Sequence, residues 1–172
     1  MPTRRQFIQV GLAGAAILVA ARLLDRAAPL APGTFLVLDS RAAALIGALA
    51  PVVLAGSLPS DAASQEVATR EIVEAFDRAV SGLSPAVQEE IAQLLSLLRF
   101  PPSRMALAGL GAPWEEATPE AIAAFLTRWR NSRFDLFRAG YQALTQLLQA
   151  AWYDNPLSWA GVGYPGPPAL PS

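Results

Sequence analysis

The stretch from residue 134 to residue 152, FDLFRAGYQALTQLLQAAW, decides the fold class. Its apolar side chains recur at intervals of three and four residues over about five turns, which is the spacing of one face of an amphipathic helix. They are Phe134, Phe137, Tyr141, Leu144, Leu148 and Trp152. Because no segment of the chain alternates with the period of two that a half-buried strand needs, we expect no sheet.

The sequence predicts further helices upstream of this stretch. Thr118-Pro119 and Ser84-Pro85 each combine a capping residue with a proline that suits the first helical turn. The segment after Ser40 is apolar nearly all round, which favours a central, buried helix. The sequence therefore predicts an all-α domain, a single bundle of about five helices over residues 40–55, 61–83, 85–100, 119–130 and 134–153. Residues 103–114 are expected to form a loop with a short helical turn.

Composition limits the functions open to this chain. Its 172 residues are 53% hydrophobic and only 16% charged, which suits one domain that hides apolar surface in a membrane or a partner. A net charge of -1 provides no basic surface for nucleic acid. The chain has no cysteine and no histidine, so thiolate and imidazole metal sites and histidine-based catalysis are excluded. We expect no catalytic residue, no metal and no cofactor in this chain.

The N-terminus has the layout of an export signal. Thr3-Arg4-Arg5-Gln6-Phe7-Ile8 places two adjacent arginines directly before an apolar run, and resembles the twin-arginine consensus. Residues 1–28 are therefore expected to direct export to the periplasm through the twin-arginine translocase. They are then either cleaved or kept as an inner-membrane anchor. Residues 29–34, with Pro29, Pro32 and Gly33, are expected to link this signal to a helical body over 35–153.

The C-terminal segment is the most unusual in composition. Residues 154–172 are rich in proline and are expected to be an extended tail. Rigid aromatic and proline side chains suit a contact surface, because little entropy is lost when they are immobilised. The tail either straps its own bundle or docks on a partner. The candidate interface residues are Trp152, Tyr153, Trp159, Tyr164, Pro165, Pro167 and Pro168.

Three other groups of residues have a functional and a structural interpretation. Glu115-Glu116 could be an acid–base pair, although adjacent carboxylates point apart and suit the entry to a helix. The glycines lack the spacing of a nucleotide site. Four arginines surround the turn before the last helix and form either an anion-binding or acidic-partner site or a solvated, ion-paired face. They are Arg128, Arg130, Arg133 and Arg138.

Together the two ends of the chain and its helical body resemble the gluconate 2-dehydrogenase subunit 3 family. The specific matches are Thr3-Arg4-Arg5-Gln6-Phe7 at the start and Tyr153-Asp154-Asn155-Pro156 with Trp159 and residues 163–168 at the end. The segment from Trp129 to Phe137 also takes part. Members are small twin-arginine subunits that accompany membrane-associated, flavin-dependent dehydrogenases of the glucose–methanol–choline (GMC) type.

The resemblance implies a non-catalytic subunit that aids maturation and export of an FAD-binding catalytic subunit. FAD is then expected in the partner, and a multihaem cytochrome c is a further partner in such complexes. The alternative is a stand-alone periplasmic helical protein that binds an apolar ligand or lipid between its helices. An enzyme that uses only carboxylates, arginine and tyrosine has no positive signal in the sequence.

Overall fold

The computed structural model describes residues 35–162, and over this range the chain is helical with no strand. The prediction of an all-α protein is confirmed for this part. The elements are α2 (Ser40–Val53), α3 (Ala62–Ser81), α4 (Pro85–Arg99), α5 (Pro101–Ser103), a π-helical turn (Arg104–Ala108), a 3₁₀ turn (Trp114–Glu116), α6 (Pro119–Arg130), α7 (Asp135–Tyr153) and α8 (Pro156–Val162). The five predicted helices correspond to α2, α3, α4, α6 and α7.

Helix starts follow the capping chemistry of the sequence. Asp39 begins α2 by accepting a hydrogen bond from the Ala42 N–H at 2.7 Å, and Asp61 begins α3 by accepting one from the Ser64 N–H at 2.8 Å. Thr118 caps α6 in the same way, at a longer 3.3 Å from the Ala121 N–H. Each cap satisfies one of the N–H groups that a helix start leaves without a partner.

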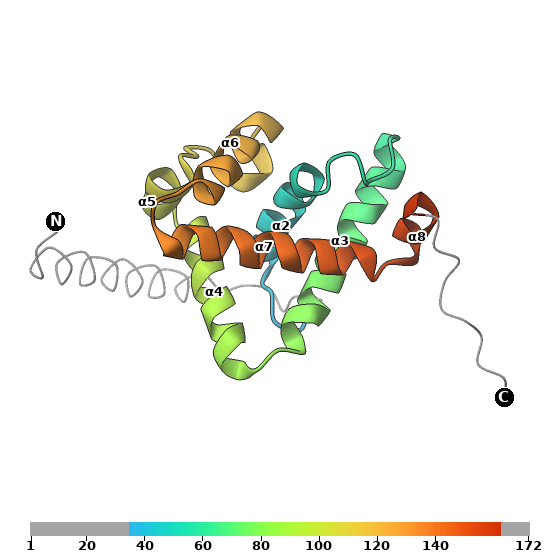
Figure 1. Ribbon diagram of the computed structural model, residues 1–172, viewed down its shortest axis with the longest axis horizontal. Coiled ribbons are helices and arrows are strands. Elements are labelled where there is room, and N and C mark those ends of the chain that lie inside the picture. The colour runs from blue at the N-terminus through green and yellow to red at the C-terminus, as the bar shows by residue number, and fades with distance from the viewer. Residues whose placement is uncertain (1–34, 163–172) are drawn as a thin grey trace, which may run out of the picture.

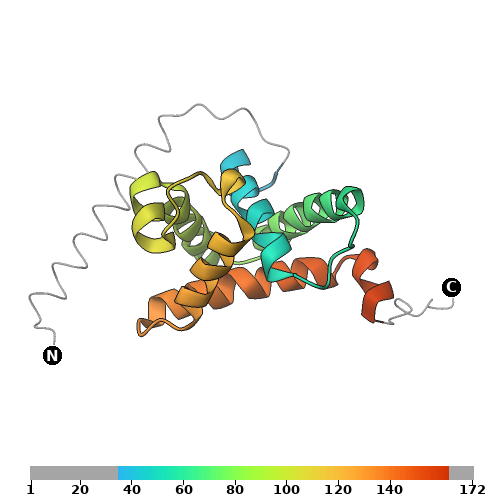
Figure 2. The ribbon, with the colours of Figure 1, turned by 90° about the horizontal axis from the view of Figure 1, so that it is seen from above.

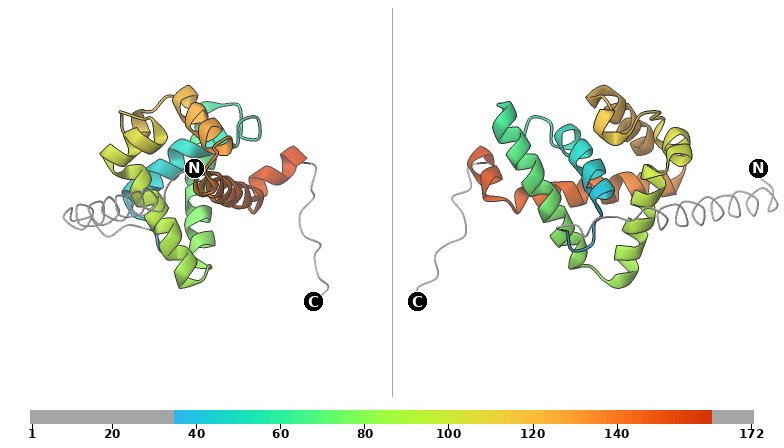
Figure 3. Two further views of the ribbon diagram at one scale, coloured as in Figure 1. Left: turned by 60° about the vertical axis from the view of Figure 1, so that its left-hand side comes forward. Right: turned by 180° about the vertical axis from the view of Figure 1, so that it is seen from behind.

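The helices cross one another around α2. α3 and α4 form a V whose vertex is the turn at residues 82–84, and α7 runs across α3 (Figures 1 and 3). Seen from above, α2 lies between the V and the pair α6–α7 (Figure 2). It contacts α3, α4, α6, α7 and the 3₁₀ turn. The nearly all-apolar segment is thus the central element, as its sequence indicates.

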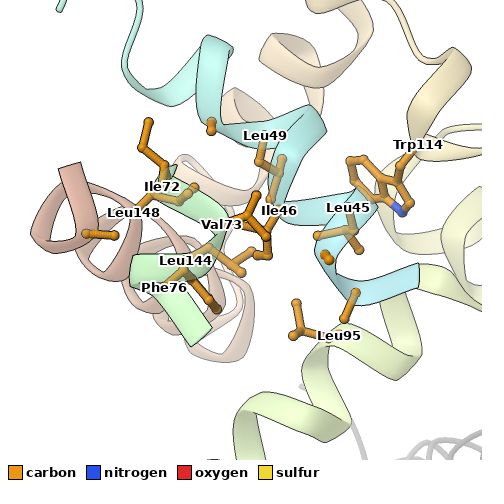
Figure 4. Close-up of a cluster of buried hydrophobic side chains, with 14 of the residues drawn as sticks. Leu45, Ile46, Leu49, Ile72, Val73, Phe76, Leu95, Trp114, Leu144 and Leu148 are labelled. Atoms are coloured by element: carbon orange, nitrogen blue, oxygen red, sulfur yellow. The ribbon is translucent and has the colours of Figure 1, made fainter. Parts of the chain in front are cut away.

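The core forms around the side chains of α2. Leu45, Ile46 and Leu49 are fully buried. Figure 4 shows them facing apolar residues of α3 and α7 on one side and Leu95 of α4 with Trp114 on the other. Truncating one such leucine to alanine removes about 2–5 kcal/mol of stability.

Two aspartates tie the first residues of the body to the V. The carboxylate of Asp77, buried on α3, accepts hydrogen bonds from the backbone N–H groups of Leu36, Val37 and Leu38 at 2.6, 2.9 and 2.8 Å. Asp39 pairs with Arg99 at the end of α4. Through these contacts, α3 and α4 together hold the segment that leads into α2.

The surroundings of Asp39 have opposing effects on its pKa. Burial by itself raises the pKa, whereas hydrogen bonds from the Arg99 side chain and the Ala42 N–H, and the charge of Arg99, lower it. The net result is a pKa below its ordinary 3.8. The joint between α2 and α4 therefore favours the ionised carboxylate.

The prediction that residues 154–172 form an extended tail is wrong for 156–162, which form α8. Pro156 is the first residue of this helix, a position where the missing N–H of proline has no helical partner to lose. The side chain of Asn155 accepts a hydrogen bond from the Leu157 N–H at 2.9 Å. Proline here begins a helix, and α8 packs against α7.

Candidate partner-binding surface

Much of what the sequence predicts to be functional lies outside the described residues. This holds for the export-signal residues Arg4, Arg5 and Phe7, and for the interface candidates Tyr164, Pro165, Pro167 and Pro168. Between residues 35 and 162, none of the helices has both the length and the apolar character needed to span a membrane. The structure thus bears on three predicted interface residues, which are Trp152, Tyr153 and Trp159.

Trp152 belongs to the core, so we withdraw it from the candidate interface. Its side chain is only 2% exposed. It continues the apolar stripe of α7 one turn after Leu148, which is also fully buried. A ring enclosed by its own domain cannot contact a partner without unfolding the end of α7.

Tyr153 and Leu157 form an exposed corner where α7 meets α8, and we call these two residues with Trp159 the α8 corner. Tyr153 is 51% exposed and Leu157 is 52% exposed. Trp159 is half-buried, and its indole Nε1 donates a hydrogen bond to the Tyr153 carbonyl oxygen at 3.2 Å. Apolar side chains on both sides of the turn thus face solvent at one place. Leu157 is not predicted from the sequence, because its exposure at this corner depends on the helix α8.

Asn155 holds the α8 corner in place. Its side-chain amide donates to the Glu71 carboxylate of α3 at 2.6 Å. Its backbone carbonyl accepts from the hydroxyl of buried Ser158 at 2.8 Å. The Asn155 side chain thus bonds both α3 and, through the Leu157 N–H, α8, while its backbone N–H bonds the Trp152 carbonyl of α7. These bonds preorganise the corner.

The predicted arginine cluster lies around the turn between α6 and α7, and its four members make different contacts. Arg128 donates to the Ala108 carbonyl at 2.6 Å, and Arg138 donates to the Ser132 carbonyl at 2.5 Å and pairs with Asp135. Arg133 lies over the Phe134 ring, 4.8 Å from its centroid. Arg130 is exposed and makes no ion pair within the described range. Two arginines are therefore structural and two face solvent.

A chain of aromatic contacts leads from the interior to this end. Trp114 contacts Phe125, Phe125 contacts Trp129, and Trp129 stacks on Phe137, with centroids 4.8–5.5 Å apart. Phe137 in turn contacts Phe134 at 5.8 Å. The indoles are also fixed, since Trp114 donates to the Leu98 carbonyl and Trp129 to the Leu107 carbonyl. Of the aromatic residues on the apolar face of α7, Trp152 is buried and Phe137 and Tyr141 pack against the core, whereas Phe134 is 52% exposed.

An open pocket of about 200 Å³ lies between α2, α6 and α7. Apolar and polar groups line it in similar number. They are Val52, Val53, Ala123, Leu126, Thr127, Arg130, Tyr141, Thr145 and Gln149. The space is smaller than the roughly 300–1,000 Å³ of most small-molecule sites.

Glu115 and Glu116 lie exposed on the 3₁₀ turn ahead of α6. They flank Trp114, which is buried. Two solvated carboxylates before a helix start agree with the interpretation that they are helix-entry charges.

No family model, curated protein or solved structure matches this chain. The resemblance to the gluconate 2-dehydrogenase subunit 3 family therefore rests on the sequence motifs alone.

Proposed function

We propose that this protein is the non-catalytic small subunit of a periplasmic, membrane-associated, FAD-dependent dehydrogenase of the GMC type. It aids the maturation of the catalytic subunit and supplies the twin-arginine signal with which both leave the cytoplasm. The observation that carries the proposal is the sequence Arg4-Arg5-Gln6-Phe7 ahead of an apolar run. The twin-arginine route moves folded proteins, so it suits a subunit that travels with a cofactor-loaded partner.

The α8 corner supports an interaction role for the body. Tyr153 and Leu157 expose large apolar surface on a rigid turn, and such preorganised side chains contribute most to an interface because little entropy is lost on binding. The residues that follow the corner include the tail candidates Tyr164 and Pro165. We infer that the corner and the tail together contact the catalytic subunit.

The test is an affinity purification of the tagged full-length protein from its own host, with an absorption spectrum of the eluate. We expect an equimolar large subunit with flavin bands, and dehydrogenase activity that identifies the substrate. A solitary, colourless protein would overturn the proposed function. Replacing Arg4 and Arg5 with lysine should leave both subunits in the cytoplasm, since the translocase requires the paired arginines.

The corner is tested separately with a double variant. Tyr153→Ser with Leu157→Ser should lose the large subunit, whereas Val87→Ser, an exposed apolar residue on α4, should retain it. If the double variant still brings the flavoprotein, the corner is not the interface, although the function stands.

The alternative of a stand-alone ligand-binding protein would use the pocket between α2, α6 and α7. Its small volume and its polar lining, which includes Arg130 and Gln149, fit an apolar ligand or lipid poorly. We therefore rank this function second.

A further inference from the structure

The turn between α6 and α7, with the first residues of α7, combines exposed apolar and cationic side chains. Phe134 is 52% exposed and Leu136, two residues later, is 77% exposed. Arg130 and Arg133 precede them and face solvent. We call these four residues the α6–α7 tip. Single exposed apolar side chains are common in soluble proteins, whereas two close in sequence beside arginines suit a contact surface.

The tip is rigidly mounted. Phe134 makes an edge contact with Phe137, which stacks on Trp129 in the core. The Ser132 hydroxyl accepts a hydrogen bond from the Phe134 N–H at 3.1 Å, and Arg138 binds the Ser132 carbonyl. The exposure of Phe134 is thus imposed by the structure, because the residues beneath the ring already fill the core.

Charge is distributed unevenly around the tip. Residues 128–138 contain four arginines and one aspartate, whereas the rest of the described chain contains five arginines and twelve acidic residues. A basic tip on an otherwise acidic body turns that tip toward an anionic surface and the body away from it. The guanidinium group of arginine is planar and carries several N–H donors, so it suits lipid phosphates.

We propose that the α6–α7 tip docks on an anionic membrane surface, with Phe134 and Leu136 entering the boundary between headgroups and acyl chains. Arg130 and Arg133 then contact lipid phosphates. The tip and the α8 corner lie at opposite ends of α7, about 28 Å apart for its 19 residues. One end can therefore hold the membrane while the other holds a protein, and the inference does not depend on the identity of that protein.

The test uses the full chain and a probe at the tip, so that membrane binding by any other segment does not affect the reading. The chain has no cysteine, so Leu136→Cys provides a single site for an environment-sensitive fluorophore, and Val67→Cys on α3 is a matched exposed control. Each labelled protein is mixed with vesicles of phosphatidylcholine, with or without phosphatidylglycerol. Brominated acyl chains then report contact with the bilayer by quenching.

We expect a blue shift and quenching at position 136 on anionic vesicles, and neither at position 67. Both signals should weaken in 1 M salt, where the Debye length falls to about 3 Å. Arg130→Gln with Arg133→Gln should weaken insertion at 136 about fivefold for each arginine. The equal charge change Arg70→Gln with Arg78→Gln on α3 should not.

Three results would overturn the proposal. They are absence of quenching at 136 on anionic vesicles, equal quenching at 136 and 67, and a response at 136 only when the flavoprotein subunit is added. The last would assign the tip to a protein contact.

Discussion

Around its start α7 exposes Phe134 and Leu136 near the solvent-facing Arg130 and Arg133, while at its last turn it buries Trp152 and exposes the neighbouring Tyr153. Phe134 and Trp152 are the two ends of one apolar stripe with one periodicity, yet only the second lies in the core. The difference comes from the surroundings. α3 and α8 pack against α7 and Asn155 ties α3 to the corner, whereas the aromatic contacts of α6 already end at Phe137. Spacing defines a stripe, and neighbouring helices decide how much of it is buried.

The largest expected difference in stability is between the alanine variants of Trp152 and of Tyr153. Trp152→Ala should lower the free energy of unfolding by about 3–5 kcal/mol, because it leaves a large cavity in the core. Tyr153→Ala should change it by less than about 0.5 kcal/mol, since the ring is half exposed. Urea unfolding followed by circular dichroism measures both. Comparable losses would place Tyr153 in the core and remove it from the α8 corner.

The dependence of stability on pH tests the cap of α2, which lies in the middle of the molecule. Asp39→Ala should cost about 1–2 kcal/mol through loss of the α2 cap. Since the folded pKa of Asp39 lies below its ordinary 3.8, its contribution is present above that pH and is lost as the pH falls through the folded pKa. Unfolding curves below pH 3.8 should show this loss in the wild type and not in Asp39→Asn. An unchanged acid dependence in Asp39→Asn would assign the loss to other carboxylates.

Gly140 tests how tightly α7 packs against Trp129 at the end of α7 that carries the α6–α7 tip. A Cβ at Gly140 on α7 would lie 2.7 Å from Cζ3 of Trp129, so Gly140→Ala should destabilise by about 1–2 kcal/mol despite the better helix propensity of alanine. Gly47→Ala on α2 is the control, because its Cβ would meet side chains only at 3.8 Å and beyond. Thermal unfolding should show the control equal to or above wild type. A stabilised Gly140→Ala would mean that the ring of Trp129 moves freely.

The smallest expected effect is a loss of stability confined to the α8 corner. Asn155→Ala removes the bond to Glu71 and the cap of α8, so amide exchange over residues 156–162 should become about tenfold faster, for a loss of about 1–1.5 kcal/mol. Exchange in α2 should not change. Protection of α8 equal to that in wild type would show that packing on α7, and not Asn155, holds it.

The fold follows from the sequence at the points where local chemistry is decisive. Thr118, Asp39 and Asp61 cap α6, α2 and α3 with their side chains as their positions indicate. Pro85 begins α4 as predicted, but the Ser84 side chain makes no capping hydrogen bond. The extended tail is wrong at Pro156, because proline is excluded from the interior of a helix but suits its first turn, and the cap by Asn155 places it in the first turn. The sequence shows four arginines around the turn before α7, but which of them bind backbone carbonyl groups could not be predicted. It depends on carbonyl groups such as that of Ala108, which lies 20 residues away from Arg128.

The sequence by itself determines that this protein is helical, where its long helices begin, which faces are apolar, and that the chain starts with a twin-arginine pattern. These properties depend on spacing and on interactions within a few residues. Only the tertiary structure decides that Trp152 is buried and Phe134 exposed, and that Asp77 binds three N–H groups some 40 residues away. It also decides that Arg128 and Arg138 bind backbone carbonyl groups. Burial and pairing of this kind depend on which distant segments meet, and periodicity carries no information on that.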